Sequence, residues 1–217
     1  MKSNPLTGRY LFHCHTKITD ATNLVEDYFR FAQIHDIDRI IFLEHIRREP
    51  RYSVSDFKKD VNDTASRFHK EAVVGFETRI LPDGELDIDR DVFDSADVIG
   101  IAEHRFVGET EDNLRALDQV FDRFQVEAKH KTMVWVHPGL WLKKRGQLKE
   151  YRHEYSRLMT SASEKGFYIE MNLRYSIARE SDLTGISNSR VCYGADAHTP
   201  EDLNRWAAQF MGRLPSR

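Results

Sequence analysis

Cysteine is scarce in this chain, and long apolar runs are absent. Cys14 and Cys192 lie inside short apolar segments that resemble buried strands, so we expect two reduced core residues and no disulfide. No segment approaches the ~20 apolar residues that cross a bilayer. The opening MKSNPLTGRY lacks the apolar centre of a signal peptide. These absences predict a cytoplasmic protein that does not associate with membranes.

An excess of charge of one sign is also missing. The 217 residues contain 32 Lys and Arg against 35 Asp and Glu, which gives a formal net charge of −3. A dedicated nucleic-acid-binding protein is usually basic, so we expect no stable binding to nucleic acid. The sequence shows no internal repeat, low-complexity segment or Gly/Ser/Pro-rich linker. We therefore predict one domain over residues 1–217, which is long enough for a substantial core.

Short apolar runs alternate with amphipathic stretches along the chain. The step of four and three between Leu24, Tyr28 and Phe31 is typical of a helix. We expect helices at 23–36, 53–70, 111–131 and 150–165, a last helix capped by Thr199, and a small hairpin at 81–89. The expected strands are 9–15, 39–45, 72–80, 97–104, 132–138, 167–172 and 190–198.

This alternation predicts an α/β fold in which helices cover a parallel sheet. Seven strand units favour a closed or nearly closed barrel over an open sheet. In either arrangement, ligands bind at the carboxyl ends of the strands.

The stretch FHCHT places two histidines at the end of the first expected strand. Residues i and i+2 of a strand point to the same face, so His13 and His15 should converge while Cys14 points away. Neutral imidazole is the commonest metal ligand in proteins. The pair therefore indicates a metal site, provided that other strands supply further donors.

Further donors stand at the other strand ends. Six of the ten histidines and three carboxylates fall on the expected rim: His13, His15, His45, His104, His137, His198, Asp20, Glu77 and Asp196. A catalytic metal takes about three protein ligands, so nine donors suit two or three divalent ions. Nitrogen and oxygen donors without thiolate favour zinc, manganese or iron.

Other polar residues near these donors have structural interpretations. Glu44 and Glu103 precede ligand histidines, so strand alternation turns them toward the helix layer. Glu170 and Asn172 share a face at the end of the sixth strand, and their role stays open. Three of the remaining histidines lie in the last turns of expected helices, where a cationic side chain suits the helix dipole.

The ordered strings FHCHT with Asp20, LEH, GFE, AEH, VHPG and GADAH resemble the polymerase and histidinol phosphatase (PHP) family. The similarity extends from about Tyr10 to Leu203. It implies a distorted seven-stranded (βα)7 TIM-like barrel. The family contains phosphatases for small molecules, phosphodiesterases, and domains attached to bacterial replicative polymerases.

The resemblance also implies how the donors share the metals. It assigns one ion to His13, His15, Glu77 and Asp196. Glu77 would bridge to a second ion at His104 and His137. The third ion would be held by Asp20, His45 and His198.

The activity implied is hydrolysis of a small anionic phosphomonoester, with a metal-bridging hydroxide attacking phosphorus. Asp196 or a metal-bound water would protonate the leaving group. Three alternatives are a phosphodiesterase or nuclease of the same family, an amidohydrolase-like enzyme, and a non-catalytic metal-binding module. Amidohydrolases also use His-x-His on a barrel, but usually with eight strands and a bridging lysine.

A phosphate ester should also contact cationic side chains on the rim. Three loops offer them: Arg47, Arg48 and Arg51; Lys143, Lys144 and Arg145; and Arg174 and Arg179. Arg47 and Arg174 are closest in sequence to the strand ends and are the expected substrate-binding residues. Solvated surface charge is the alternative for each of them. Trp141 is a possible stacking surface for the substrate.

Overall fold

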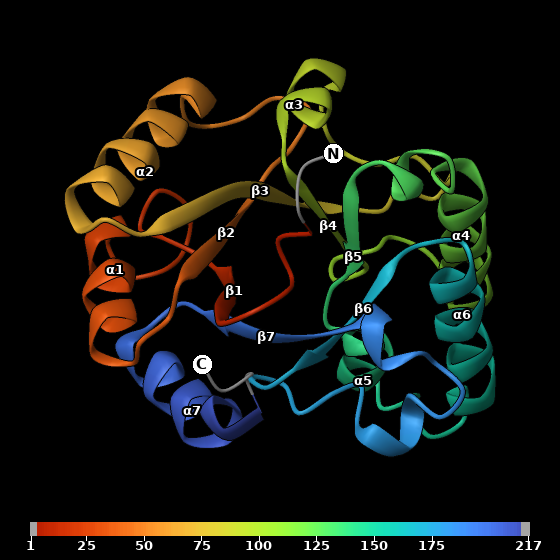
Figure 1. Ribbon diagram of the computed structural model, residues 1–217. Coiled ribbons are helices and arrows are strands. Elements are labelled where there is room, and N and C mark those ends of the chain that lie inside the picture. The colour runs from red at the N-terminus through yellow and green to blue at the C-terminus, as the bar shows by residue number, and fades with distance from the viewer. Residues whose placement is uncertain (1–3, 214–217) are drawn as a thin grey trace.

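The strands form a closed parallel barrel, as expected for a (βα)7 TIM-like fold. The computed structural model describes residues 4–213. Seven strands follow one another in chain order, and β7 closes the barrel against β1 (Figure 1). The strands are β1 Tyr10–Cys14, β2 Arg39–His45, β3 Glu71–Arg79, β4 Val98–Ala102, β5 Thr132–Trp135, β6 Tyr168–Asn172 and β7 Val191–Ala197.

Helices surround the barrel, with α1 beside α2 and α4 beside α6 (Figure 1). The α-helices are α1 Val25–Ile34, α2 Val54–Phe68, α3 Arg90–Ser95, α4 Thr110–Arg123, α5 Leu140–Lys144, α6 Arg152–Glu164 and α7 Pro200–Phe210. Short 3-10 turns lie at Glu127–Lys129, Glu180–Asp182, Asn188–Arg190 and Met211–Arg213. Within residues 4–213, no helix has both the length and the apolar character that a membrane span requires.

Local sequence signals explain several of these boundaries. Thr199 caps α7 by accepting a hydrogen bond from the backbone N–H of Asp202 at 3.3 Å, and Pro200 takes the first helical position. The expected helix at 111–131 ends at Arg123 and continues only as a 3-10 turn. The expected hairpin at 81–89 is reduced to one isolated bridge between Ile80 and Leu86.

The core has two layers. Apolar side chains such as Phe12 and Leu43 fill the barrel interior, and a larger layer lies between the strands and the helices. Gly100 leaves room for Leu43, because a Cβ at that position would lie 2.6 Å from Leu43 Cδ2. Cys192 lies in the inner layer and Cys14 in the outer one, and both are free and buried, as predicted.

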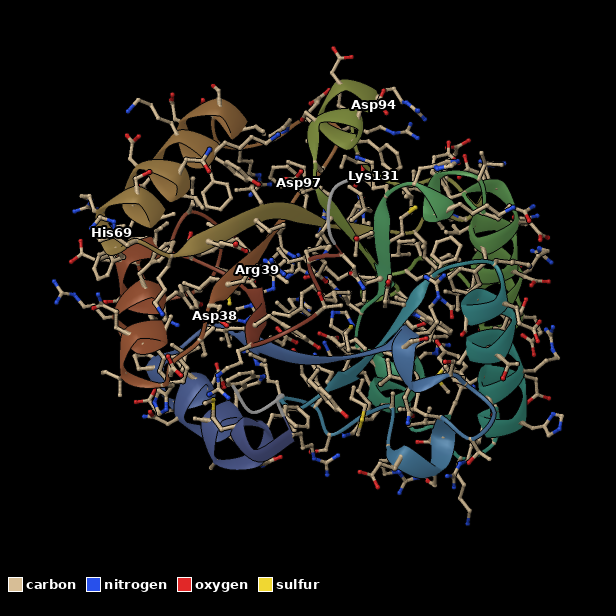
Figure 2. All side chains as sticks on the ribbon, in the orientation of Figure 1. Asp38, Arg39, His69, Asp94, Asp97 and Lys131 are labelled. Atoms are coloured by element: carbon tan, nitrogen blue, oxygen red, sulfur yellow. The ribbon has the colours of Figure 1, made fainter. Side chains whose placement is uncertain are left out.

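Charged side chains at the amino ends of the strands are paired with other groups of the protein. Figure 2 labels six residues in this region: Asp38, Arg39, His69, Asp94, Asp97 and Lys131. The Lys131 ammonium donates to the carbonyl oxygens of Phe93 at 2.9 Å and of Ala96. Arg39 donates to Glu71 at 2.8 Å. His69 ends α2 in a left-handed conformation, so it belongs to a helix terminus, as expected.

Candidate metal centre

All nine proposed donors lie together at the carboxyl rim of the barrel. Glu77 and Asp196 project from β3 and β7, His13 lies in β1, and His45 ends β2. The remaining donors follow strand ends in the adjoining loops: His15, Asp20, His104, His137 and His198. The structure thus places the predicted residues together, and their metal binding stays a prediction.

Glu77 is the centre of this arrangement. Its side chain is 1% exposed, and both carboxylate oxygens face imidazole nitrogens. Oε2 lies 3.3 Å from His13 Nε2, 3.3 Å from His15 Nε2 and 3.2 Å from His45 Nδ1. Oε1 lies 3.2 Å from His104 Nδ1 and 3.0 Å from His137 Nε2. One carboxylate shared by five imidazoles suits a ligand that bridges two cations.

The donor atoms fall into four overlapping groups, each with its atoms within 4.8 Å of one another. These groups are His13, His15 and Glu77; His13, His137 and Asp196; His45, Glu77 and His104; and His15, Asp20, His45 and His198. The last group contains the whole set that the resemblance assigns to the third ion, with His15 added. His45 connects two groups, because its Nδ1 faces Glu77 and its Nε2 lies 3.4 Å from Asp20 Oδ2.

The imidazoles fit divalent cations. Both ring nitrogens of His15 and the Nδ1 atoms of His45, His104 and His137 are buried and make no hydrogen bond. Three of these nitrogens lie 3.2–3.3 Å from Glu77, but without the geometry of a hydrogen bond. Buried polar atoms normally find partners, and a metal would accept the one lone pair that each neutral imidazole carries. Burial and the neighbouring His45 hold the pKa of His15 well below its usual value, and burial lowers the pKa of His104 to about 3. Both imidazoles are therefore neutral near pH 7, which is the form that binds metal.

Glu170 holds His13 from the side opposite Glu77. Its Oε1 lies 2.6 Å from His13 Nδ1, and its Oε2 accepts from the backbone N–H of His137 at 2.5 Å. When Nδ1 of His13 donates to Glu170, its Nε2 is left with a lone pair toward Glu77. The sequence placed Glu170 on the correct face but left its role open. A carboxylate two residues before the end of β6 was the available signal.

The backbone is distorted at three of the proposed ligands. His13, His137 and Asp196 have positive φ angles of 69°, 33° and 48°. The pairing of β1 with β2 also shifts register between Phe12 and Cys14. Regular strand alternation therefore does not by itself explain how His13 and His15 converge. Strained backbone of this kind is concentrated at functional sites, where surrounding packing maintains it.

Glu44 and Glu103 point toward the helix layer, as strand alternation predicts. Glu44 accepts a hydrogen bond from the backbone N–H of Thr16, in the loop that leads to Asp20. Glu103 accepts from the backbone N–H of Gly139 at 2.6 Å, and burial raises its pKa to about 7. These carboxylates anchor the loops that carry the donors.

The two expected substrate-binding arginines both lie beside the donors. Arg174 Nη1 lies 3.4 Å from Asp196 Oδ1 and also contacts His198 Nδ1. Arg47 lines a cavity of about 300 Å³ together with Asp20, His45 and His104. Arg47 also lies 3.6 Å from Asp87, which leaves its guanidinium partly neutralised.

Asp196 is ionised in this setting. Burial alone would raise the pKa of its carboxyl, but the imidazoles of His13 and His198 hold that pKa well below its usual value. Its Oδ2 accepts from the Asn172 amide at 3.2 Å.

Trp141 does not offer the stacking surface that its sequence position suggested. Its side chain is buried, and the indole N–H donates to the Phe106 carbonyl oxygen at 3.2 Å. The Arg145 guanidinium covers the ring at 4.5 Å from its centroid. The segment expected to be a loop forms α5, which packs this indole into the core.

Known proteins give a likeness of fold alone. No protein-family model and no curated protein matches this sequence. A solved structure described as an amidohydrolase II is 10% identical, with a TM-score of 0.57 over 91% of this chain and 90% of the other. N-isopropylammelide isopropylaminohydrolase from Burkholderia multivorans is 14% identical, with a TM-score of 0.44 over 86% of this chain and 61% of that enzyme. The first similarity supports the TIM-like barrel.

Proposed function

We propose that this protein is a metal-dependent phosphoesterase of the PHP type that hydrolyses a small phosphomonoester. The observation that carries the proposal is the buried Glu77 carboxylate, shared by five imidazoles, with Arg47 and Arg174 on the same rim. Guanidinium groups beside a cluster of proposed metal ligands suit a substrate with several negative charges.

Two to three zinc, manganese or iron ions would be held by the nine donors, with Glu77 as the bridge. Divalent ions in such a centre would lower the pKa of a coordinated water toward neutrality and screen the charge of a phosphoryl group. Glu170 would keep Nε2 of His13 directed at its ion. Glu44 and Glu103 would hold the donor loops in place.

The remaining polar groups would act on the substrate. Arg174 and Arg47 present guanidinium groups that can pair with phosphate oxygens. Asp196 lies between Arg174 and His198 and is ionised, so it could accept a proton at the scissile ester, and a coordinated water would protonate the leaving group.

A small substrate follows from the size and charge of the site. The cavity beside Arg47 has a volume of about 300 Å³, at the lower end of the range for small-molecule sites. Binding a long polyanion needs several phosphate contacts, and the net charge of −3 gives the whole chain no excess of positive charge for them. We therefore propose no stable nucleic-acid partner, and a cytoplasmic location stays a prediction.

An amidohydrolase-like activity is the second candidate. The fold of the amidohydrolase II structure is the observation that favours it, and the fold alone is compatible with many chemistries. Glu77 would fill the bridging position where those enzymes usually have a lysine. That difference, together with the two arginines, supports the phosphoesterase.

The proposal is tested by hydrolysis assays on metal-reconstituted protein. We expect phosphate release from an aryl phosphate, dependent on manganese or zinc, and faster turnover of a nucleoside monophosphate or a sugar phosphate than of a short single-stranded oligonucleotide. Preference for the oligonucleotide would favour the nuclease. Hydrolysis of a cyclic amide without phosphate release would favour the amidohydrolase, and inactivity on every substrate would favour a binding module.

A further inference from the structure

A second cavity lies beside the metal centre and is not used by the chemistry proposed above. Its volume is about 460 Å³, and its lining comes from the segments after β5 and β6 and from α6. None of its lining residues lines the cavity beside Arg47. Tyr155, Met159 and Ile177 form buried, largely apolar walls. Such walls suit the apolar part of a small molecule.

The rim of this cavity is positively charged. Lys143, Lys149, Arg152 and Arg179 line it with one carboxylate, that of Asp182. Arg152 and Arg179 share Asp182, at 2.5 and 3.5 Å. The Lys143 ammonium donates to a neutral backbone carbonyl, and no ion pair among residues 4–213 involves Lys143 or Lys149. The cavity therefore carries an excess of positive charge that one anionic group would offset.

The wall formed by residues 172–178 is strained. Ser176 and Ala178 both line the cavity and have positive φ angles of 51° and 48°. Two backbone hydrogen bonds between Asn172 and Ile177, at 3.0 and 3.2 Å, close this turn. Non-glycine residues held in this conformation cost free energy and recur at ligand sites. The turn thus fixes the cavity wall that Ser176 and Ala178 form.

The same turn joins the cavity to the metal centre. The Asn172 amide donates to Asp196 at 3.2 Å, and the Tyr175 ring lies 6.0 Å from the His137 ring. Pro138, which follows His137 directly, lines the cavity. An occupant would therefore lie one residue from a proposed metal ligand.

We propose that this cavity binds a small molecule in which a phosphate or carboxylate group is attached to an apolar body. The anionic group would meet Lys149 and Lys143 at the rim, and the apolar body would pack on Met159. The occupant is either a part of the substrate that carries a second charged group or a separate molecule. Binding does not depend on hydrolytic activity, so it can be tested apart from the proposed function.

Methyl NMR tests binding at this position. The full chain is labelled with ¹³C at the methionine methyl groups, and the Met159 signal is assigned by its loss in Met159→Leu. Titration with phenylphosphonate should shift the Met159 signal to saturation and leave that of Met133, buried on β5, unchanged. Benzyl alcohol, which has a similar apolar body without the charge, should bind at least tenfold more weakly. An unmoved Met159 signal would overturn the proposal.

A charge reversal sharpens the test. Lys149 is exposed, so Lys149→Glu should leave the fold intact and weaken phenylphosphonate binding by about tenfold or more. Lys129→Glu makes the same change on an exposed lysine of another segment and should leave binding unchanged. Equal affinities in both variants would show that the rim charge does not bind the anion, and would contradict the proposal.

Kinetic measurements then show whether the anionic group belongs to the substrate or to a separate molecule. A sugar bisphosphate and the monophosphate of the same sugar differ by one phosphate group. If the cavity holds part of the substrate, the bisphosphate should have a KM at least tenfold lower, and Lys149→Glu should remove that advantage. Equal KM values, with phenylphosphonate still shifting Met159, assign the cavity to a separate molecule.

Discussion

At the scale of single residues, the rim is organised by carboxylates placed on either side of the imidazoles. Glu77 faces them from the centre, and Glu170 faces His13 from behind. Both are nearly or completely buried. A buried carboxylate without partners would be costly, so each has to be satisfied by donors or by cations. Because each carboxylate depends on these partners, even the conservative replacement of Glu by Gln should disturb the site.

Glu170→Gln should weaken metal binding by about 10- to 100-fold, because the amide supplies a weaker partner to His13 Nδ1 than the carboxylate does. Its shape is almost unchanged, so the fold should be retained. Competition with a chromogenic chelator measures the affinity. Glu164→Gln, at the exposed end of α6, is the matched control. Equal metal affinity in the Glu170 variant and the wild type would remove Glu170 from the site.

Arg47→Ala and Arg174→Ala should each lower kcat/KM for the preferred monoester by ~10- to 100-fold, a loss of about 1.4–2.8 kcal/mol. Each removes a guanidinium that we propose to pair with the phosphate. Metal content should stay at the wild-type value, which elemental analysis checks. Unchanged kinetics on every monoester would show that these arginines carry only surface charge.

The convergence of the proposed donors could be predicted because all of them except Asp20 stand at or just past the end of an apolar run, and Asp20 lies in the loop that follows the first one. The contact between Glu170 and His13 could not, since it passes over β7 and depends on the missing side chain at Gly194. The expected role of Trp141 was wrong because its indole N–H finds a buried acceptor at Phe106.

At the scale of elements, β1, β6 and β7 show how the strands make room for the site. Gly194 on β7 pairs with Asn172 on β6 and with Phe12 on β1. A Cβ at Gly194 would lie 1.6 Å from Glu170 Oε1. The glycine therefore creates the space in which Glu170 reaches His13.

Gly194→Ala should displace Glu170, lower the free energy of unfolding by ~1–3 kcal/mol, and weaken metal binding as Glu170→Gln does. Urea unfolding and the chelator competition measure the two effects. Gly212→Ala is the control, because a Cβ there meets no atom within 4 Å. A Gly194 variant with wild-type stability and metal affinity would contradict this packing argument.

The long elements could be predicted from periodicity, while the short ones could not. Helix α3 has six residues and α5 has five, too few for a hydrophobic period to show. Their positions depend on tertiary contacts, such as the burial of Leu142 and Trp141 in the outer core layer. The register shift at His13 is likewise set by pairing with β2 and β7.

At the scale of the whole molecule, the barrel interior serves packing, and its carboxyl rim carries the polar side chains of the candidate site. Apolar side chains fill the inner layer, and the carboxyl rim collects six imidazoles, several of whose ring nitrogens are buried without a hydrogen-bond partner. The closed sheet holds the nine donors on β1, β2, β3, β4, β5 and β7 or on the loops that follow these strands. Metal ions should therefore stabilise the fold as well as supply the chemistry.

Chelation should lower the melting temperature. A single site held at ~1,000 times its Kd adds about 4 kcal/mol of stability, which corresponds to roughly 8–16 °C for a chain of this size. Differential scanning calorimetry with and without chelator gives the shift, and re-addition of manganese or zinc should restore it. A melting temperature that changes neither with chelator nor with added metal would argue against a metal centre.

The central claim is that the rim cluster is a multinuclear metal centre with Glu77 as its bridge. Elemental analysis of protein expressed in metal-supplemented medium tests it most directly. We predict two to three divalent transition-metal ions per chain. Glu77→Gln should lose at least one ion and lower phosphatase activity by ~100-fold or more, while Glu71→Gln, at the exposed start of β3, should retain both. Fewer than one ion per wild-type chain, or a fully loaded and active Glu77→Gln variant, would contradict the account.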